Sequence, residues 1–217
     1  MKKILIAVPC MDMVSARFAQ SLATLQKIEG TQAIISFLAG SLVYDSRNKL
    51  AAMAVNMEAD YIMWFDSDMV FAPDTLVKMM KTLDEHPEID ILSGLYFRRA
   101  TPFTPVLFKK LERAGSGVEY EDYKEIPDGL FEVAGCGFGC VLMKTDCLYG
   151  MVDEEGIGNW FEPFNKAGED CAFCIRAREA GYKVYCDPDI ALGHMGYAPV
   201  TRSFYEAMKE NDNGTIG

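Results

Sequence analysis

Nearly uninterrupted apolar runs alternate with helically spaced apolar residues along the first 95 positions. The runs at 3–8, 33–39, 61–65 and 89–92 predict strands covered on both faces, because few polar side chains interrupt them. Between the runs, apolar side chains recur every three or four residues, as on a helix with one buried face. This alternation predicts an α/β fold with a doubly wound, mostly parallel sheet.

Three helices are expected between these strands. Gly30 is expected to end the first, Ser46 to cap the second and Pro73 to start the third. Their apolar stripes are Val14, Phe18, Leu22, Leu25 and Ile28; Leu50, Met53, Ala54 and Met57; and Leu76, Met79, Met80 and Leu83.

The second half of the chain predicts a small additional β region. Short β segments are expected around 105–108, 130–133 and 139–143, before a helix over 169–180 that ends at Gly181. A last strand follows at 183–186. Because residues 211–217 are polar and bear glycine, a flexible tail is expected there, after a single domain over 1–210.

The polar, acidic stretch at 111–127 interrupts this pattern. Gly115-Ser116-Gly117 is expected to be mobile. We interpret 115–124 as a lid whose Tyr120 and Tyr123 close over a bound ligand.

Charge narrows the range of partners. The chain has 21 Lys and Arg against 32 Asp and Glu, a formal charge of −11. Such a protein repels nucleic-acid backbones and anionic lipid, so a bound nucleotide needs a metal or a few placed cations. No apolar stretch is long enough to span a membrane, and the N-terminal apolar run, which stops at Pro9, is expected to be a strand rather than a signal peptide.

The seven cysteines are an odd number, and most lie in apolar runs. This indicates reduced, buried thiols in a cytoplasmic protein. Cys136 with Cys140 and Cys171 with Cys174 were considered as zinc ligands, but their spacing favours core packing.

Asp66-Ser67-Asp68 is the strongest local signal for chemistry. Two carboxylates follow an apolar strand directly, and open α/β sheets bind ligands beyond the carboxyl ends of their strands. A divalent cation would stabilise both carboxylates and bridge a diphosphate. Asp and Ser are also common in ordinary turns, so the motif alone leaves a turn and a metal site equally open.

Two further residues have chemistry that suits such a site. Arg47 near a helix start opposes the helix dipole, which a neighbouring diphosphate would explain, although a surface pair with Asp45 or Glu58 is the alternative. His194 lies between glycines after a strand and is interpreted as a ligand or as a half-buried histidine, whereas His86 belongs to a polar helix end.

The glycines of 135–139 lack the Lys and Ser/Thr of a phosphate-binding loop. They either admit a sugar or acceptor close to the backbone or form a bulge or tight turn. Trp160, Phe161 and Phe164 alternate with polar residues and are interpreted as an apolar platform for a sugar, with core packing as the alternative.

Taken in order, these motifs resemble the GT-A type glycosyltransferases, in particular short bacterial and phage-encoded, family-2-like members. The resemblance spans residues 3–196 and rests on four segments. These are Ser46-Arg47-Asn48, Asp66-Ser67-Asp68, Gly135-Cys136-Gly137-Phe138-Gly139, and Gly168-Glu169-Asp170 followed by Gly193-His194.

The resemblance implies a GT-A, Rossmann-like sheet and transfer of a sugar, with inversion, from a UDP- or GDP-linked donor to an unidentified acceptor. It implies Mn²⁺ or Mg²⁺ on Asp68 and His194, with Asp66 near the ribose or the waters of the metal. Imidazole with carboxylate suits Mn²⁺.

The same resemblance assigns the remaining residues. Asp170 is the implied catalytic base, with Glu169 as its capping or acceptor-binding partner. Pro9 and Cys10 fall where relatives hold the nucleotide base, and Arg47 and Ser67 join the donor site. Gly135, Gly137 and Trp160 fall on the acceptor side.

Three other functions compete with this interpretation. A haloacid-dehalogenase-type phosphatase would carry the motif after its first strand, whereas two strand–helix units precede it here. A nucleotidyltransferase would need a glycine-rich basic loop, which 9–15 lacks. A non-catalytic nucleotide-sugar or glycan-binding module stays open, although it would have no need of Asp170.

Overall fold

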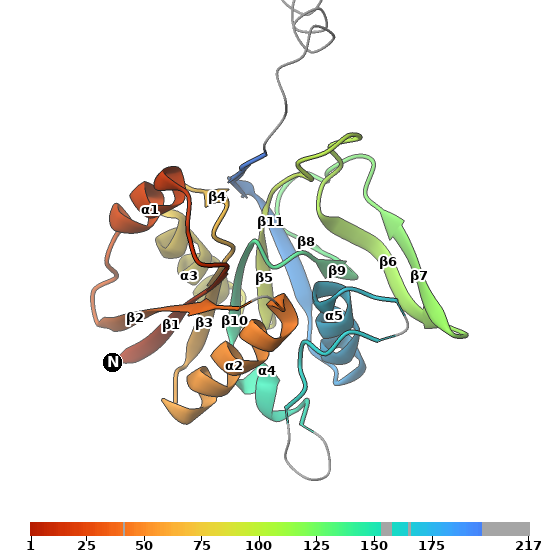
Figure 1. Ribbon diagram of the computed structural model, residues 1–217, viewed down its shortest axis with the longest axis horizontal. Coiled ribbons are helices and arrows are strands. Elements are labelled where there is room, and N and C mark those ends of the chain that lie inside the picture. Colours follow the sequence, from red (N-terminus) through yellow and green to blue (C-terminus); the bar gives the residue numbers. More distant parts are fainter. Residues whose placement is uncertain (41, 153–157, 165, 197–217) are drawn as a thin grey trace, which may run out of the picture.

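A seven-stranded sheet with helices on both faces forms the centre of the molecule (Figure 1). The computed structural model describes residues 1–40, 42–152, 158–164 and 166–196. In spatial order the strands are β2 (Thr31–Ala39), β1 (Lys2–Cys10), β3 (Tyr61–Phe65), β10 (Cys140–Lys144), β5 (Ile91–Leu95), β11 (Val184–Ala191) and β8 (Phe131–Glu132). The helices are α1 (Ala16–Ala23), α2 (Val43–Asn56), α3 (Thr75–Glu85), α4 (Asp146–Tyr149) and α5 (Glu169–Glu179).

Five of the seven strands run parallel, which confirms the predicted α/β fold. β1 pairs in parallel with β2 and β3, and β5 pairs in parallel with β11. β10 lies antiparallel between β3 and β5, and β8 is antiparallel at the edge. The carboxyl ends of the five parallel strands and the start of β10 therefore meet at one edge of the sheet.

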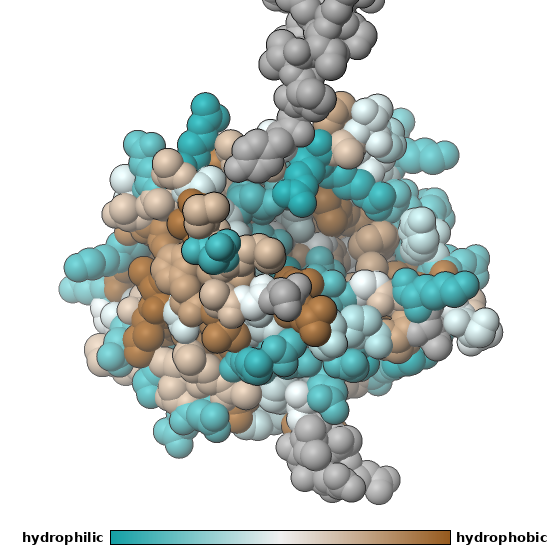
Figure 2. All heavy atoms as spheres, in the orientation of Figure 1, coloured by the Kyte–Doolittle hydropathy of each residue, from teal (hydrophilic) through white to brown (hydrophobic). Residues whose placement is uncertain are grey.

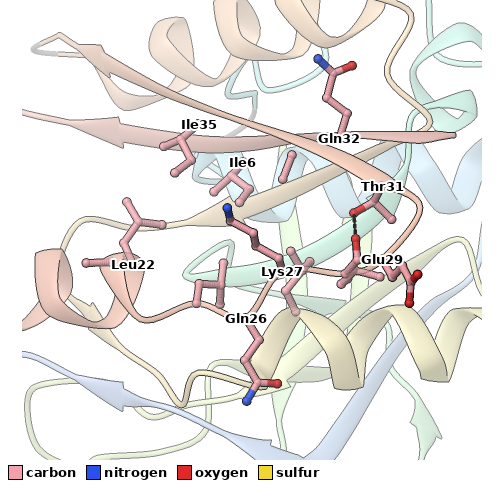
Figure 3. A pocket seen from close by; sticks show the side chains of 13 residues that line it. Ile6, Leu22, Gln26, Lys27, Glu29, Thr31, Gln32 and Ile35 are labelled. Carbon is pink, nitrogen blue, oxygen red and sulfur yellow. Dashed lines mark hydrogen bonds between the residues drawn. The ribbon is translucent and has the colours of Figure 1, made fainter.

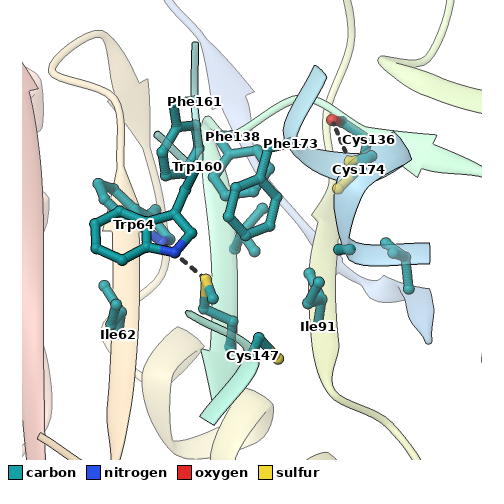
Figure 4. Packing of buried hydrophobic residues seen from close by; sticks show 14 of the residues in the cluster. Ile62, Trp64, Ile91, Cys136, Phe138, Cys147, Trp160, Phe161, Phe173 and Cys174 are labelled. Carbon is teal, nitrogen blue, oxygen red and sulfur yellow. Dashed lines mark hydrogen bonds between the residues drawn. The ribbon is translucent and has the colours of Figure 1, made fainter. Parts of the chain in front are cut away.

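Successive side chains of each strand point to opposite faces of the sheet and pack into two separate hydrophobic cores. On β1, Leu5 and Ala7 pack on the side of α2 and α5, whereas Ile4 and Ile6 pack on the side of α1 and α3. The first core contains an aromatic cluster of Trp64, Phe138, Phe161 and Phe173 (Figure 4). Each of these aromatic side chains buries on the order of 150–250 Å² of surface, so the cluster contributes strongly to the packing beneath the carboxyl edge of the sheet.

Two small sheets extend the fold. Of the predicted short β segments, only that at 105–108 contributes to them, because those at 130–133 and 139–143 form β8 and β10 of the central sheet. β4 (Met69–Val70) pairs with β12 (Gly193–His194), which brings His194 opposite Met69. β6 (Leu107–Ala114) pairs with β7 (Gly117–Asp122) and with β9 (Gly135–Cys136).

The segment at 115–117, which was predicted as a mobile loop, forms the tight turn of the β6–β7 hairpin and the first residue of β7. Gly115 supplies the positive φ of +54° at this turn. Val118 and Tyr123 pack against the core, and the Tyr123 hydroxyl donates to the carbonyl of Glu132. The segment expected to act as a lid is therefore built largely of paired strands, and of its two tyrosines Tyr120 is exposed whereas Tyr123 is partly buried.

Helix starts and ends also differ from the predictions. α1 ends at Ala23 rather than near Gly30, since the amide of Gln26 turns away to donate to the carbonyl of Pro73. α3 begins at Thr75 rather than Pro73. α2 begins at Val43, so Ser46 is buried inside the helix and caps nothing. The tail expected at 211–217 lies outside the described residues.

An apolar surface lies at the β2 edge of the sheet. Ile34, Ile35 and Phe37 are exposed there, and hydrophobic side chains gather on the left of Figure 2. Beside them, a cavity of about 780 Å³ opens between β2 and the chain after α1, with Leu22 and Ile35 in its wall (Figure 3). Its lining holds Lys27 and Glu29 but none of the predicted site residues. Among the described helices, none has the length and apolarity to cross a membrane.

Candidate active site

A cleft of about 290 Å³ lies at the carboxyl edge of the sheet. It forms where the ends of β1 and β3 meet the N-terminal halves of α2 and α5. It is smaller than the cavity beside β2 but contains all eight of the predicted donor-site and catalytic residues. These are Pro9, Cys10, Arg47, Asp66, Ser67, Asp68, Glu169 and Asp170.

Arg47 lies at the bottom of the cleft among three carboxylates, which we call the Arg47 cluster. Its Nη2 lies 2.9 Å from Oδ1 of Asp66 and 3.6 Å from Oδ1 of Asp170, and its Nε lies 3.7 Å from Oε1 of Glu169. The side chain is 1 % exposed. It belongs to the first half of α2 and shares the buried face of that helix with Leu50, Ala51 and Ala54, which turns it inward rather than onto the surface.

The aromatic core supports this guanidinium from below. Its Cζ lies 5.5–5.8 Å from the ring centroids of Trp64, Phe138 and Phe161, within the range of cation–π attraction. The alternative surface pair with Asp45 is wrong, because Asp45 pairs with Lys49. The predicted diphosphate contact of Arg47 stays untested, but its three acidic neighbours indicate a residue that positions carboxylates.

Burial and charge oppose each other in the Arg47 cluster. Burial alone would lower the pKa of Arg47, but the three carboxylates raise it above the ordinary value. For Asp66 the balance is reversed, because burial raises its pKa more than Arg47 lowers it. Removing one member therefore leaves buried charges unpaired.

We expect Arg47→Met to destabilise the fold strongly. Loss of one partner of a buried ion pair costs about 3–5 kcal/mol, since the remaining carboxylates lose their counter-charge. Urea unfolding followed by circular dichroism measures this change. Lys49→Met, on an exposed face of the same helix, is the matched control and should change stability by about 1 kcal/mol or less. Equal stabilities of the two variants would contradict the role of Arg47.

Asp68 faces the opposite wall of the cleft. Its Oδ2 lies 2.5 Å from Nη1 of Arg99 and 3.4 Å from Nε2 of His194. Burial raises the pKa of Asp68, but the hydrogen bond to His194 and the charges of His194 and Arg99 outweigh this effect and lower it. The same contact raises the pKa of His194.

The pairing of β12 with β4 brings His194 to Asp68, a contact that the sequence alone did not define. Nδ1 of His194 lies 2.8 Å from the carbonyl oxygen of Phe97. A carbonyl oxygen only accepts, so Nδ1 carries the proton. When His194 is neutral, the lone pair of Nε2 then points at the Asp68 carboxylate and the two repel each other. A cation bound between them would remove this repulsion.

The predicted metal ligands are only partly brought together. Within the described parts of the chain, no group of three His, Cys, Asp or Glu side chains could hold a metal ion. Asp66 is turned toward Arg47, whereas Asp68 and His194 face each other. These two fit a metal that keeps positions open for substrate oxygens, and imidazole with carboxylate suits Mn²⁺.

Asp170 is held at the N-terminus of α5 by two contacts. Its Oδ2 accepts a hydrogen bond of 3.3 Å from the amide of Phe138, and its Oδ1 is buried near Arg47. Burial is the main cause that raises the pKa of Asp170 to about 7; Arg47 opposes it, and the charges of Glu169 and Asp66 add to it. The side chain is still 27 % exposed, so it can contact a ligand. The predicted capping by Glu169 is wrong, since Gly168 holds the N-cap position without a side-chain bond and Glu169 turns to Arg47.

The predicted contact of the Gly135–Gly139 backbone with a sugar or acceptor is wrong for Gly135 and Gly137, which are buried. A Cβ at Gly135 would lie 2.6 Å from Leu111, and one at Gly137 would lie 2.1 Å from the hydroxyl of Tyr96. These glycines admit the protein's own side chains and leave the Phe138 amide directed at Asp170.

The predicted sugar platform is wrong for Trp160 and Phe161. Trp160 is 6 % exposed and donates through Nε1 to the carbonyl of Leu148, while Phe161 is fully buried in the aromatic cluster (Figure 4). The alternation of aromatic and polar residues therefore reflected core packing.

The burial predicted for most of the cysteines is confirmed. All seven are free, and Cys136, Cys140 and Cys174 are buried in the core. The sulfur of Cys174 contacts the carbonyl of Cys136, and that of Cys140 contacts Met79. Core packing accounts for the burial of Cys136, Cys140 and Cys174.

A mostly parallel sheet with an acidic cleft at its carboxyl edge is consistent with a GT-A type glycosyltransferase. Residues 29–144 match the family model described as glycosyl transferase family 2. This segment is more than half of the chain, and the protein belongs to that family. The match includes Arg47, Asp66 and Asp68 but ends before Asp170 and His194. The assignment of these two residues to the site therefore depends on their contacts with Arg47 and Asp68.

Two solved structures share the fold. A197 from STIV superimposes with a TM-score of 0.57 at 21 % identity, over 93 % of this chain and 97 % of that one. S. aureus TarS 1–349, in complex with UDP-GlcNAc, gives a TM-score of 0.56 at 19 % identity. That comparison covers 97 % of this chain, which spans 65 % of the TarS chain. No curated protein matches the sequence significantly.

Proposed function

We propose that this glycosyltransferase moves a sugar from a UDP- or GDP-linked donor to an acceptor hydroxyl, with inversion, at a divalent metal. The observation that carries the proposal is one cleft with Asp68 and His194 on one wall and Asp170 on another. The UDP-GlcNAc complex of TarS supports the donor class. Seven free cysteines support a reducing, cytoplasmic location.

Donor binding would use the ends of β1 and β3. Pro9 and Cys10 line the cleft beside the first strand and would contact the nucleotide base through backbone and shape. Asp68 and His194 would hold Mn²⁺ or Mg²⁺, with Asp66 toward the ribose or the waters of the metal and Ser67 between them. When bound, the metal supplies positive charge to the leaving diphosphate.

Asp170 would act as the general base. Its carboxylate takes the proton of the acceptor hydroxyl as that oxygen attacks the anomeric carbon, and the bond to the diphosphate breaks on the opposite face. The Phe138 amide and Arg47 keep the carboxylate in place during this transfer. Glu169, beside it, would contact the acceptor.

Thermal unfolding with a panel of nucleotide sugars tests the proposal. At about 100 times its Kd, a donor bound only by the native state adds about 2.7 kcal/mol of stability, which raises Tm by about 5–10 °C. We expect this rise with UDP- or GDP-sugars in the presence of Mn²⁺ or Mg²⁺, and its loss on addition of EDTA. An undiminished rise in EDTA would contradict metal dependence, and no rise with any donor would contradict the proposal.

The pH dependence of transfer provides a second test. A base must be deprotonated, and burial raises the pKa of Asp170 to about 7. We therefore expect kcat/KM, which reports on the free enzyme, to fall about tenfold per pH unit below pH 7 and to level off above it. A profile that stays flat down to pH 5 would contradict a base in this environment.

A further inference from the structure

Arg99 is a basic side chain of the cleft for which the proposed function has no role. Its Nη1 lies 2.5 Å from Oδ2 of Asp68. The other arginine of the cleft, Arg47, is 1 % exposed and surrounded by three carboxylates, whereas the side chain of Arg99 is 54 % exposed. Among the described residues, the guanidinium of Arg99 pairs with one carboxylate, and an exposed ion pair of this kind can exchange its partner at little cost.

The backbone that carries Arg99 is fixed by contacts that do not involve its side chain. The amide of Arg98 donates to the carbonyl of Thr104, and Phe97 bridges to Pro105. The guanidinium of Arg98 binds both carboxylate oxygens of Asp122, at 3.0 and 3.2 Å. The side chain of Arg99 can therefore move while its backbone keeps its place at the mouth of the cleft.

The charges of the cleft determine where Arg99 would move. Four carboxylates line it, from Asp66, Asp68, Glu169 and Asp170, and they repel an incoming diphosphate. A divalent cation at Asp68 would compete with Arg99 for Oδ2 and repel its like charge. The displaced guanidinium would meet the diphosphate, whose oxygens match its planar fork of donors.

We propose that Arg99 is a donor-binding residue that neutralises Asp68 in the free enzyme and moves to the donor diphosphate when a divalent metal binds Asp68. This inference rests on the proposed function. Replacement of Arg99 should therefore have two opposite effects. Metal binding should become tighter, because Arg99 competes with the metal for Asp68, and diphosphate binding should become weaker, because Arg99 stabilises the bound diphosphate.

Isothermal titration calorimetry on Arg99→Ala tests this prediction with two probes. Mn²⁺ alone should bind about two- to fivefold more tightly than to the wild type, because its competitor at Asp68 is gone. UDP and GDP, titrated in turn in saturating Mn²⁺, should bind about 10- to 100-fold more weakly, as expected for the loss of charge-assisted hydrogen bonds. Circular dichroism should show that the variant is folded.

Arg113→Ala is the matched control, since Arg113 is also a part-exposed arginine with a carboxylate partner, Glu179, but lies outside the cleft. It should bind both probes as the wild type does. The role of Arg99 is overturned if the wild type binds Mn²⁺ and a nucleotide but Arg99→Ala binds them equally well. It is also overturned if Arg113→Ala reproduces the effects of Arg99→Ala. If the wild type binds neither probe, the proposed function fails first and the inference falls with it.

Discussion

Asp68→Ala is expected to lower the rate of sugar transfer by about 10³-fold or more. Loss of this carboxylate removes one of the two side chains proposed to hold the metal, and the charge stabilisation of a departing diphosphate contributes several kcal/mol to catalysis. The stability of the fold should change little, because Asp68 is part-exposed and lies outside the Arg47 cluster. Release of nucleoside diphosphate from the donor measures the transfer rate.

The exposed Asp45→Ala variant is the control for Asp68. Asp45 pairs with Lys49 on the surface of α2 and should leave transfer unchanged. Calorimetry with Mn²⁺ separates the possible causes, since Asp68→Ala should also lose most of its metal affinity. Transfer at the wild-type rate by Asp68→Ala would overturn the proposed metal site.

Asp170→Asn should retain donor binding while transfer falls by about 10²–10⁴-fold, the usual contribution of a general base. The amide keeps the shape of the side chain, and its oxygen can still accept from the Phe138 amide, but it cannot take a proton. Single-turnover kinetics with donor bound in advance distinguishes slow chemistry from weak binding.

Glu179→Gln, at the exposed far end of α5, is the matched control for Asp170. Glu179 pairs with Arg113 and lies outside the cleft, so transfer should stay at the wild-type rate. Wild-type transfer by Asp170→Asn would show that another group is the base. NMR of the wild-type product tests the mechanism itself, because retained anomeric configuration would contradict a single displacement.

Local sequence patterns predicted the elements that position the cleft. The apolar run at 61–65, followed directly by Asp66 and Asp68, was sufficient to place two carboxylates at the end of a buried strand. The helix starting at Glu169 was also predicted with its correct first residue, because Gly168 precedes an apolar helical pattern. These features depend on residues within about ten positions of one another, where spacing and propensity act directly.

Residues whose roles depend on distant neighbours were misread. The surface alternative for Arg47 considered acidic residues close in sequence, whereas its partners lie 19 or more positions away. Trp160 was interpreted as a sugar platform, but it is buried in the core with Phe161, whose amide donates to the side chain of Asn48, 113 positions earlier. Gly135 and Gly137 were assigned to a substrate although they make room for Leu111 and Tyr96.

The sequence by itself determined the order of strand–helix units, the acidic motif at a strand end and the acidic start of the last helix, because each follows from short-range periodicity and turn chemistry. The tertiary structure alone decided what surrounds them. The insertion of β10 between β3 and β5 directs the Phe138 amide at Asp170. The pairing of β12 with β4 brings His194 to Asp68, 126 positions away in sequence, and the turn after β5 brings Arg99 to the same oxygen. These contacts depend on strand order, which the hydrophobic pattern of one chain leaves open, since every buried strand satisfies that pattern equally well.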